Sequence, residues 1–246
     1  MGIGNAFSPV QAGIFLTVPV VAQIQNYLTA NGGSFSGNEI VMVMAGANDI
    51  FTQAGSVGPS YPPASAVAAV QTAASELAND VKTQIIGKGA KYVVVANIPD
   101  IASTPYGNSI DNHSPIPNDM TNPVVFLNYL VTTFNAQLKA SLPDSVNVLN
   151  IDAYTASHDE VTNPAKYNLT NVTGTACDLR PYNASTNPNP YANPLGSSLA
   201  CNSNNLTAGV IATDHYLFAD TVHPTPYGYL LFATYVLQAM TNKGWY

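Results

Sequence analysis

The segment Asp220-Thr221-Val222-His223 carries the clearest chemistry in the sequence. An aspartate three residues before a histidine can accept the proton of the imidazole Nδ1, which leaves Nε2 to act as a base. An apolar run at helical spacing, 225–241, follows the pair at once, so we expect the pair in a tight segment that opens a helix. Such a pair supplies two of the three groups of a hydrolytic triad.

A second polar turn, Gly46-Ala47-Asn48-Asp49, follows the apolar run 39–45. The Asn48 amide can donate a hydrogen bond to a developing oxyanion without itself titrating. Gly46 permits the close approach of a substrate, because glycine has no side chain. An Asn-Asp pair after a strand is also a common helix cap, so this turn alone leaves both interpretations open.

Alternating strand and helix patterns must position these residues. Apolar runs of strand length lie at 39–45, 91–96 and 146–151, and helical patterns lie at 18–30, 64–86 and 122–142. Such runs are typical of strands that are buried on both faces of a parallel sheet. The order predicts an α/β fold, a three-layer α/β/α sandwich with a parallel sheet.

We expect a single domain over residues 1–246, with a long Asn- and Pro-rich flap at about 152–216 that has no regular elements of its own. Cys177 and Cys201 lie in this flap, and both a disulfide and a pair of reduced thiols are open interpretations. A bridge would close a loop of about 25 residues and stabilise the fold by roughly 3 to 4 kcal/mol.

The composition argues against several partners. The net charge is −7 and Arg180 is the only arginine, so no basic patch is available for nucleic acid or anionic lipid. No apolar run is long enough for stable membrane insertion. Charged residues make up only 9% of the chain, and a surface of Asn, Thr, Ser and Tyr favours a secreted or cell-surface/periplasmic protein. The first five residues lack signal-peptide features, so we expect an exported form to begin after its signal.

The turn at Gly46–Asp49 and the segment Asp220–His223 together resemble the third and fifth sequence blocks of the GDSL, or SGNH, hydrolases, a family of esterases and lipases. The flanking text and the cysteine pair are similar to the esterase passenger domains of bacterial autotransporters, and the resemblance covers nearly the whole chain. It implies a flavodoxin-like SGNH-hydrolase sandwich that acts on small esters with short acyl chains and needs no cofactor. It also implies roles: His223 as general base, Asp220 as its orienting carboxylate, and Asn48, helped by the backbone near Gly46, as oxyanion donor.

The family's nucleophilic serine lies in a Gly-Asp-Ser-Leu block after its first strand, and a second block supplies an oxyanion glycine. Neither block occurs in the sequence, so we expect the first strands to be missing. No Gly-x-Ser-x-Gly elbow is present either. Ser8, in the N-terminal glycine-containing loop, is the candidate nucleophile, whereas Ser145 precedes its strand and is expected at the amino edge of the sheet.

Several alternatives stay open. Without a serine, His223 could activate water directly, or the chain could be an inactive remnant of the fold that binds or supports other molecules. Asp214 and His215 could join the Asp–His pair in a metal cluster, although their spacing is not typical of one. His113 and His158 are expected in solvated loops.

Loss of the first strands would leave residues 40–45 as a long apolar sheet edge. Such an edge recruits another strand. We expect either that the N-terminal segment folds back onto it or that two chains pair there as a homodimer.

Overall fold

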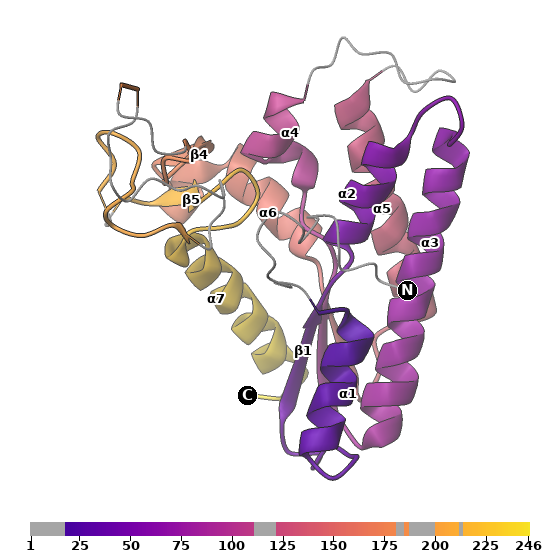
Figure 1. Ribbon diagram of the computed structural model, residues 1–246. Coiled ribbons are helices and arrows are strands. Elements are labelled where there is room, and N and C mark those ends of the chain that lie inside the picture. Colours follow the sequence, from indigo (N-terminus) through magenta and orange to yellow (C-terminus); the bar gives the residue numbers. More distant parts are fainter. Residues whose placement is uncertain (1–17, 111–121, 181–184, 187–199, 212–213) are drawn as a thin grey trace. The chain divides into compact units, whose positions relative to one another are not determined.

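The computed structural model describes residues 18–110, 122–180, 185–186, 200–211 and 214–246 (Figure 1). The chain divides into two compact units. The first comprises 1–99, 111–154 and 239–246, and the second comprises 100–110 and 155–238. The single-domain organisation expected from the sequence stays a prediction.

The first unit contains a three-stranded sheet of β1 (Ile40–Met44), β2 (Tyr92–Ala96) and β3 (Val148–Ile151), in the order β1-β2-β3. Both strand pairs are parallel, and their registers run without a bulge from Ile40 opposite Tyr92 and from Val93 opposite Val148. The α/β class and the parallel sheet predicted from the sequence are therefore confirmed.

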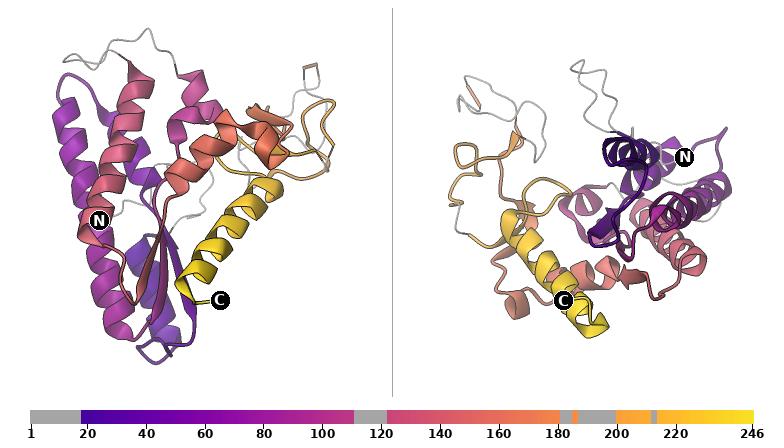
Figure 2. Two further views of the ribbon diagram at one scale, coloured as in Figure 1. Left: turned by 180° about the vertical axis from the view of Figure 1, so that it is seen from behind. Right: turned by 90° about the horizontal axis from the view of Figure 1, so that it is seen from below.

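The helices of the first unit are α1 (Val20–Ala30), α2 (Ala47–Ser56), α3 (Pro63–Asp80) and α5 (Pro123–Ser141). A π turn, Val81–Ile85, and a 3-10 turn, Ile86–Lys88, extend α3 before the chain enters β2. The two long helices α3 and α5 lie side by side in both views (Figure 2). α5 lies within the helical pattern predicted at 122–142, and the Asn122 side chain caps it by accepting hydrogen bonds from the backbone N–H groups of Val124 and Val125.

The core of the first unit lies where these two helices meet the central strand. Val93, Val94 and Val95 of β2 are all buried, as are Val70 of α3 and Phe134 of α5. β2 therefore fits the prediction of a strand buried on both faces, because consecutive residues of a strand point to opposite faces of the sheet.

The same prediction is wrong for β1. Val43 is buried, but Ile40, Met42 and Met44 are 45%, 58% and 51% exposed. In the described part of the chain β1 pairs with β2 alone. A continuous apolar run shows only that the residues are hydrophobic. It does not distinguish a central strand from an edge strand with one covered face.

The second unit contains α4 (Pro105–Ser109), most of α6 (Ala153–Thr162), β4 (Asn171–Thr175), β5 (Tyr216–Phe218) and most of α7 (Pro226–Lys243). β4 and β5 pair in parallel. Leu169, Leu217 and Phe218 are buried together and form a small core with side chains from α6 and α7.

The predicted flap at 152–216 needs correction, because α6, a 3-10 turn (Pro164–Tyr167) and β4 lie within it. Seven of the ten residues of α6 are Tyr, Thr, Ser, His, Asp or Val, which are weaker helix formers, so local helix propensity did not predict it. Tertiary contacts hold it instead. Within the second unit, the backbone N–H of Asp100 donates to the Ser157 hydroxyl.

The Cys177–Cys201 disulfide is confirmed, with the two Cα atoms 5.8 Å apart. On the chain-entropy model a bridge across this separation stabilises the fold by roughly 3 to 4 kcal/mol. Among the described helices, none is both long and apolar enough to cross a membrane.

We predict that β1 pairs edge to edge with β1 of a second chain. An antiparallel pair centred on Met42 would place the exposed Met42 side chains opposite each other, and β1 carries no charged residue to prevent this. Light scattering coupled to size-exclusion chromatography should show a dimer, and Met42→Lys should give a monomer. Val125→Lys, which replaces another exposed apolar residue (64%) on α5, should leave the dimer intact. A monomer at all concentrations of the parent chain would contradict edge pairing.

Candidate active site

Asp220 and His223 are in direct contact within the second unit. His223 Nδ1 lies 2.8 Å from Oδ2 and 3.1 Å from Oδ1 of Asp220. The carboxylate is buried, with 4% of its side chain exposed, while the imidazole is 51% exposed. A carboxylate can only accept, so this contact assigns the imidazole proton to Nδ1 and makes Nε2 the acceptor.

The loop between these two residues is closed by the same carboxylate. Asp220 Oδ1 also accepts the backbone N–H groups of Val222, at 2.8 Å, and His223, at 2.6 Å. The Ala219 N–H donates to the His223 carbonyl oxygen at 2.8 Å. The backbone therefore fixes the imidazole against the carboxylate, instead of leaving the pairing to side-chain rotation.

Thr225 joins this loop to β5 and α7. Its hydroxyl donates to the Tyr216 carbonyl oxygen at 2.6 Å and accepts the Gly228 N–H at 3.1 Å. Its own N–H donates to the Leu217 carbonyl oxygen at 2.9 Å. Thr225 is buried, so these bonds are made away from water and hold the start of α7 against β5.

Helix α4 supports the loop from its other side, and sequence reasoning missed this. The Tyr106 N–H donates to the Thr221 carbonyl oxygen at 2.8 Å. A signal for α4 was present, because Thr104 precedes Pro105 and caps the helix by accepting the Gly107 N–H. No local sequence pattern could predict the hydrogen bond between Tyr106 and Thr221, because the two residues lie more than 100 positions apart.

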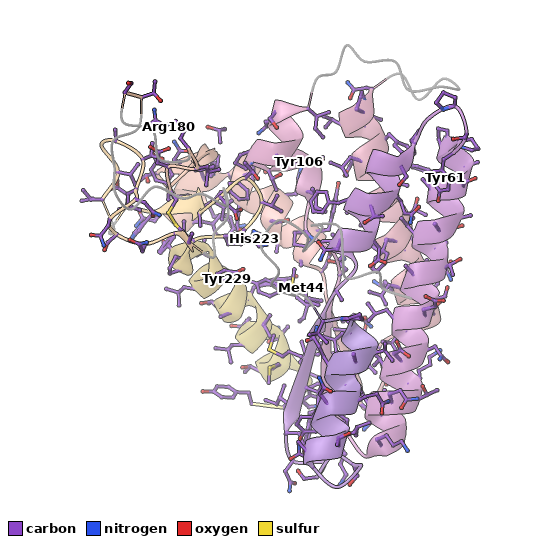
Figure 3. All side chains as sticks on the ribbon, in the orientation of Figure 1. Met44, Tyr61, Tyr106, Arg180, His223 and Tyr229 are labelled. Atoms are coloured by element: carbon purple, nitrogen blue, oxygen red, sulfur yellow. A yellow bond between two sulfur atoms is a disulfide. The ribbon has the colours of Figure 1, made fainter. Side chains whose placement is uncertain are left out.

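The electrostatics of the pair favour a basic imidazole. The hydrogen bond to Asp220 raises the pKa of His223 above its ordinary 6.5, with a further contribution from the Asp220 charge, and burial opposes the shift only in part. Because the folded-state pKa is raised, the stability that this contact adds is fully present below the unfolded pKa and is lost as pH rises through the folded pKa. Burial, followed by the Asp220 charge, raises the pKa of Tyr229, so its phenol stays protonated at the start of α7 (Figure 3).

Gly46 and Asn48 belong to the first unit, where they form the start of α2 directly after β1. Gly46 is the N-cap of this helix and has a φ of 118°, a left-handed conformation that favours glycine. A Cβ at this position would lie 2.2 Å from the buried ring of Phe134. Asn48 is in the first helical turn, where backbone N–H groups and the helix dipole favour negative charge.

Two serines of interest lie within the described residues, namely Ser145, considered from the sequence, and Ser56, which shares α2 with Asn48. Ser8 lies outside the described residues. The Ser56 hydroxyl donates to the Thr52 carbonyl oxygen at the end of α2. Ser145 precedes β3, as predicted, and its N–H and carbonyl oxygen both pair with Val148.

Two other histidines, His215 and His158, lie within the described residues. His215 stacks on Tyr227, with ring centroids 3.8 Å apart, and its Nδ1 lies 2.9 Å from the Asn168 carbonyl oxygen. Within the described part of the chain, no three His, Cys, Asp or Glu side chains are grouped as a metal site would require. His113 lies outside the described residues.

His158 is not in a solvated loop as expected. It lies on α6, and its Nδ1 is 2.7 Å from Oδ2 of buried Asp100. No local pattern could predict this second Asp–His pair, because its members are 58 positions apart in the sequence.

The family model described as GDSL-like Lipase/Acylhydrolase matches residues 15–236. This match spans β1, the start of α2 and the Asp220–His223 loop. A comparison with curated proteins found no match.

Gly46→Ala should destabilise the first unit by about 2 to 5 kcal/mol, because the new Cβ combines an unfavourable φ with overlap of the Phe134 ring. Chemical denaturation followed by circular dichroism measures the change. Gly55→Ala is the matched control on the same helix. It has open space around its Cβ and should leave stability unchanged or raise it by up to about 1 kcal/mol. Equal stability of the two variants would contradict the steric role of Gly46.

Proposed function

This chain belongs to the GDSL-like lipase/acylhydrolase family and is a hydrolase acting on ester bonds, and we propose that Asp220 and His223 supply the general base for that reaction. The observation that carries the proposal is the 2.8 Å contact between His223 Nδ1 and the buried Asp220 carboxylate. It leaves the exposed Nε2 with the lone pair that proton abstraction requires.

His223 takes a proton from a hydroxyl group as that oxygen attacks the ester carbonyl carbon. The resulting imidazolium stays paired with Asp220, which stabilises the charge in a site with few other charges. When the tetrahedral intermediate collapses, His223 returns the proton to the leaving alcohol. A water molecule then repeats the sequence on the acyl group and releases the carboxylic acid.

Asn48 is proposed as the donor to the oxyanion, helped by the backbone N–H groups at the start of α2. An amide donor does not titrate, so it favours the oxyanion at every pH at which His223 is a base. Gly46 fits this role because a bulkier residue cannot adopt its conformation against Phe134.

Ser8 is our candidate for the attacking hydroxyl, and short-chain acyl esters are the proposed substrates. A specific observation favours a second candidate function: the 246 residues contain neither a Gly-Asp-Ser-Leu block nor a Gly-x-Ser-x-Gly elbow. On that basis the alternative is an inactive member of the family that keeps the fold for binding. Direct activation of water by His223 is a third route and should be slow, because it forgoes covalent catalysis.

The disulfide and the acidic composition favour a compartment outside the cytosol. Disulfides persist in oxidising environments, so we propose that the protein is secreted or held at the cell surface or in a periplasm.

A net charge of −7 opposes nucleic acid as a partner and leaves small neutral esters as the proposed ligands.

His223→Ala should lower hydrolysis of p-nitrophenyl acetate and butyrate by about 10² to 10⁴-fold, because the base is lost. With the parent chain, kcat/KM should rise with pH through an inflection above 6.5, where His223 loses its proton. Asp220→Asn should move that inflection to lower pH and reduce the rate, because the bond that raises the pKa is removed. His215→Gln is the control for a histidine outside the pair and should keep the parent rate. Turnover unchanged in His223→Ala would contradict the proposed base.

A fluorophosphonate probe should label one residue of the parent chain, and mass spectrometry of the labelled peptide should place it at Ser8. Labelling should fall in His223→Ala, because the base activates the hydroxyl, and should disappear in Ser8→Ala. Ser56→Ala serves as the matched control. If no residue is labelled and no ester is hydrolysed, the inactive alternative holds, and if hydrolysis occurs without labelling, the water route holds.

A further inference from the structure

A groove in the second unit is separate in its lining residues from the Asp220–His223 pair. It has a volume of about 600 Å³ and lies between α6, the 3-10 turn that follows it, and α7. Its apolar and aromatic lining includes Ala156, Tyr167, Leu231 and Tyr235. All of its lining residues belong to the second unit.

Most charges at this groove are already paired. Lys166 Nζ lies 2.5 Å from Asp159 Oδ2, and the Tyr167 hydroxyl donates to the same oxygen. His158 Nδ1 is held by Asp100. On the groove wall, Lys166, Asp159 and His158 therefore each have a hydrogen-bonding partner already.

Glu160 is different. It is 9% exposed, it lines the groove, and among the described residues no donor makes a hydrogen bond to it. Burial, and then the charge of Asp159, raise its pKa to about 7. A buried carboxyl without a donor is costly in the ionised form, so a ligand that brings both positive charge and N–H donors would relieve that cost.

We propose that the groove binds a small organic ammonium ion with an apolar body, with the ammonium at Glu160 and the apolar part against Leu231 and Tyr235. Charge selects the class of ligand, because the Asp159–Lys166 pair is neutral overall and the ionised Glu160 leaves the groove lining with a net negative charge. The aromatic rings of Tyr167 and Tyr235 add a surface that suits a cation with a hydrocarbon body.

The titratable groups around Glu160 determine how binding of the ammonium ion depends on pH. Asp159 and Lys166 stay ionised as a pair near neutral pH, since the pKa of Asp159 is lowered to about 2, chiefly by its bond to Lys166, and the pKa of Lys166 is raised by the same bond. His158, held by Asp100, and the phenols of Tyr167 and Tyr235 are the other titratable groups on the lining. Ionisation of Glu160 through about pH 7 therefore strengthens ammonium binding.

Isothermal titration calorimetry of the 246-residue chain tests the proposal with 2-phenylethylamine and its neutral isostere 2-phenylethanol. At pH 8 the amine should bind about tenfold or more tightly than the alcohol, the range expected for a charge-assisted hydrogen bond. The preference should shrink at pH 6. The affinities of the parent chain for the amine and the alcohol thus test the proposal without any variant.

Glu160→Gln keeps the size of the side chain and should abolish the preference for the amine, while circular dichroism checks that the variant folds. Glu76→Gln, on α3 of the first unit, is the matched control and should bind as the parent does. Equal affinity for amine and alcohol, undetectable binding of the amine, or an amine preference that survives Glu160→Gln would each overturn the proposal. None of these readouts depends on ester hydrolysis.

Discussion

The buried carboxylate of Asp220 is the constraint on which the Asp–His loop depends. A charge with so little exposure must be hydrogen-bonded, and Asp220 meets that requirement with two backbone N–H groups and the His223 ring. The loop cannot relax without exposing or orphaning the carboxylate. The orientation of the imidazole is therefore a consequence of the folding of seven residues, 218–224, and not of a separate side-chain preference. Thr225 and α4 make hydrogen bonds to neighbouring backbone groups, and these bonds connect the constrained loop to β5 and α7.

Two glycines at the starts of helices, Gly46 and Gly228, each leave room for a neighbouring element. Gly46 follows β1 and lies against Phe134, and a Cβ on Gly228 would lie 2.9 Å from the Leu217 carbonyl oxygen of β5. In both places a helix begins where another element, α5 or β5, lies close to its backbone. The short approach lets each helix begin directly beside residues with polar chemistry, Asn48 in one unit and His223 in the other.

Sequence reasoning succeeded where the information was local. The Asp-x-x-His spacing, the helical pattern of α5 and the apolar run of β2 each depend on residues within a few positions of one another. It failed where the deciding contact was distant. The apolar run of β1 could not reveal that one face of the strand is exposed. The sequence of α6 contains mostly weaker helix formers, and it forms a helix because partners such as Asp100 hold it. In such segments, long-range contacts determine the structure more than helix or strand propensity does.

The second Asp–His pair shows what distinguishes a poised base from a structural contact. Asp100 and His158 match Asp220 and His223 in distance, 2.7 against 2.8 Å, and in the exposure of both partners. The difference lies in the backbone. Asp220 binds the N–H of the same residue whose ring it holds, whereas Asp100 caps a 3-10 turn through Ser103 and reaches a histidine on a separate helix. The distance between a carboxylate and an imidazole is thus a weak criterion for catalysis. A stronger one is that a single short loop determines both the position of the carboxylate and the direction of the ring, because no movement between elements can then uncouple them.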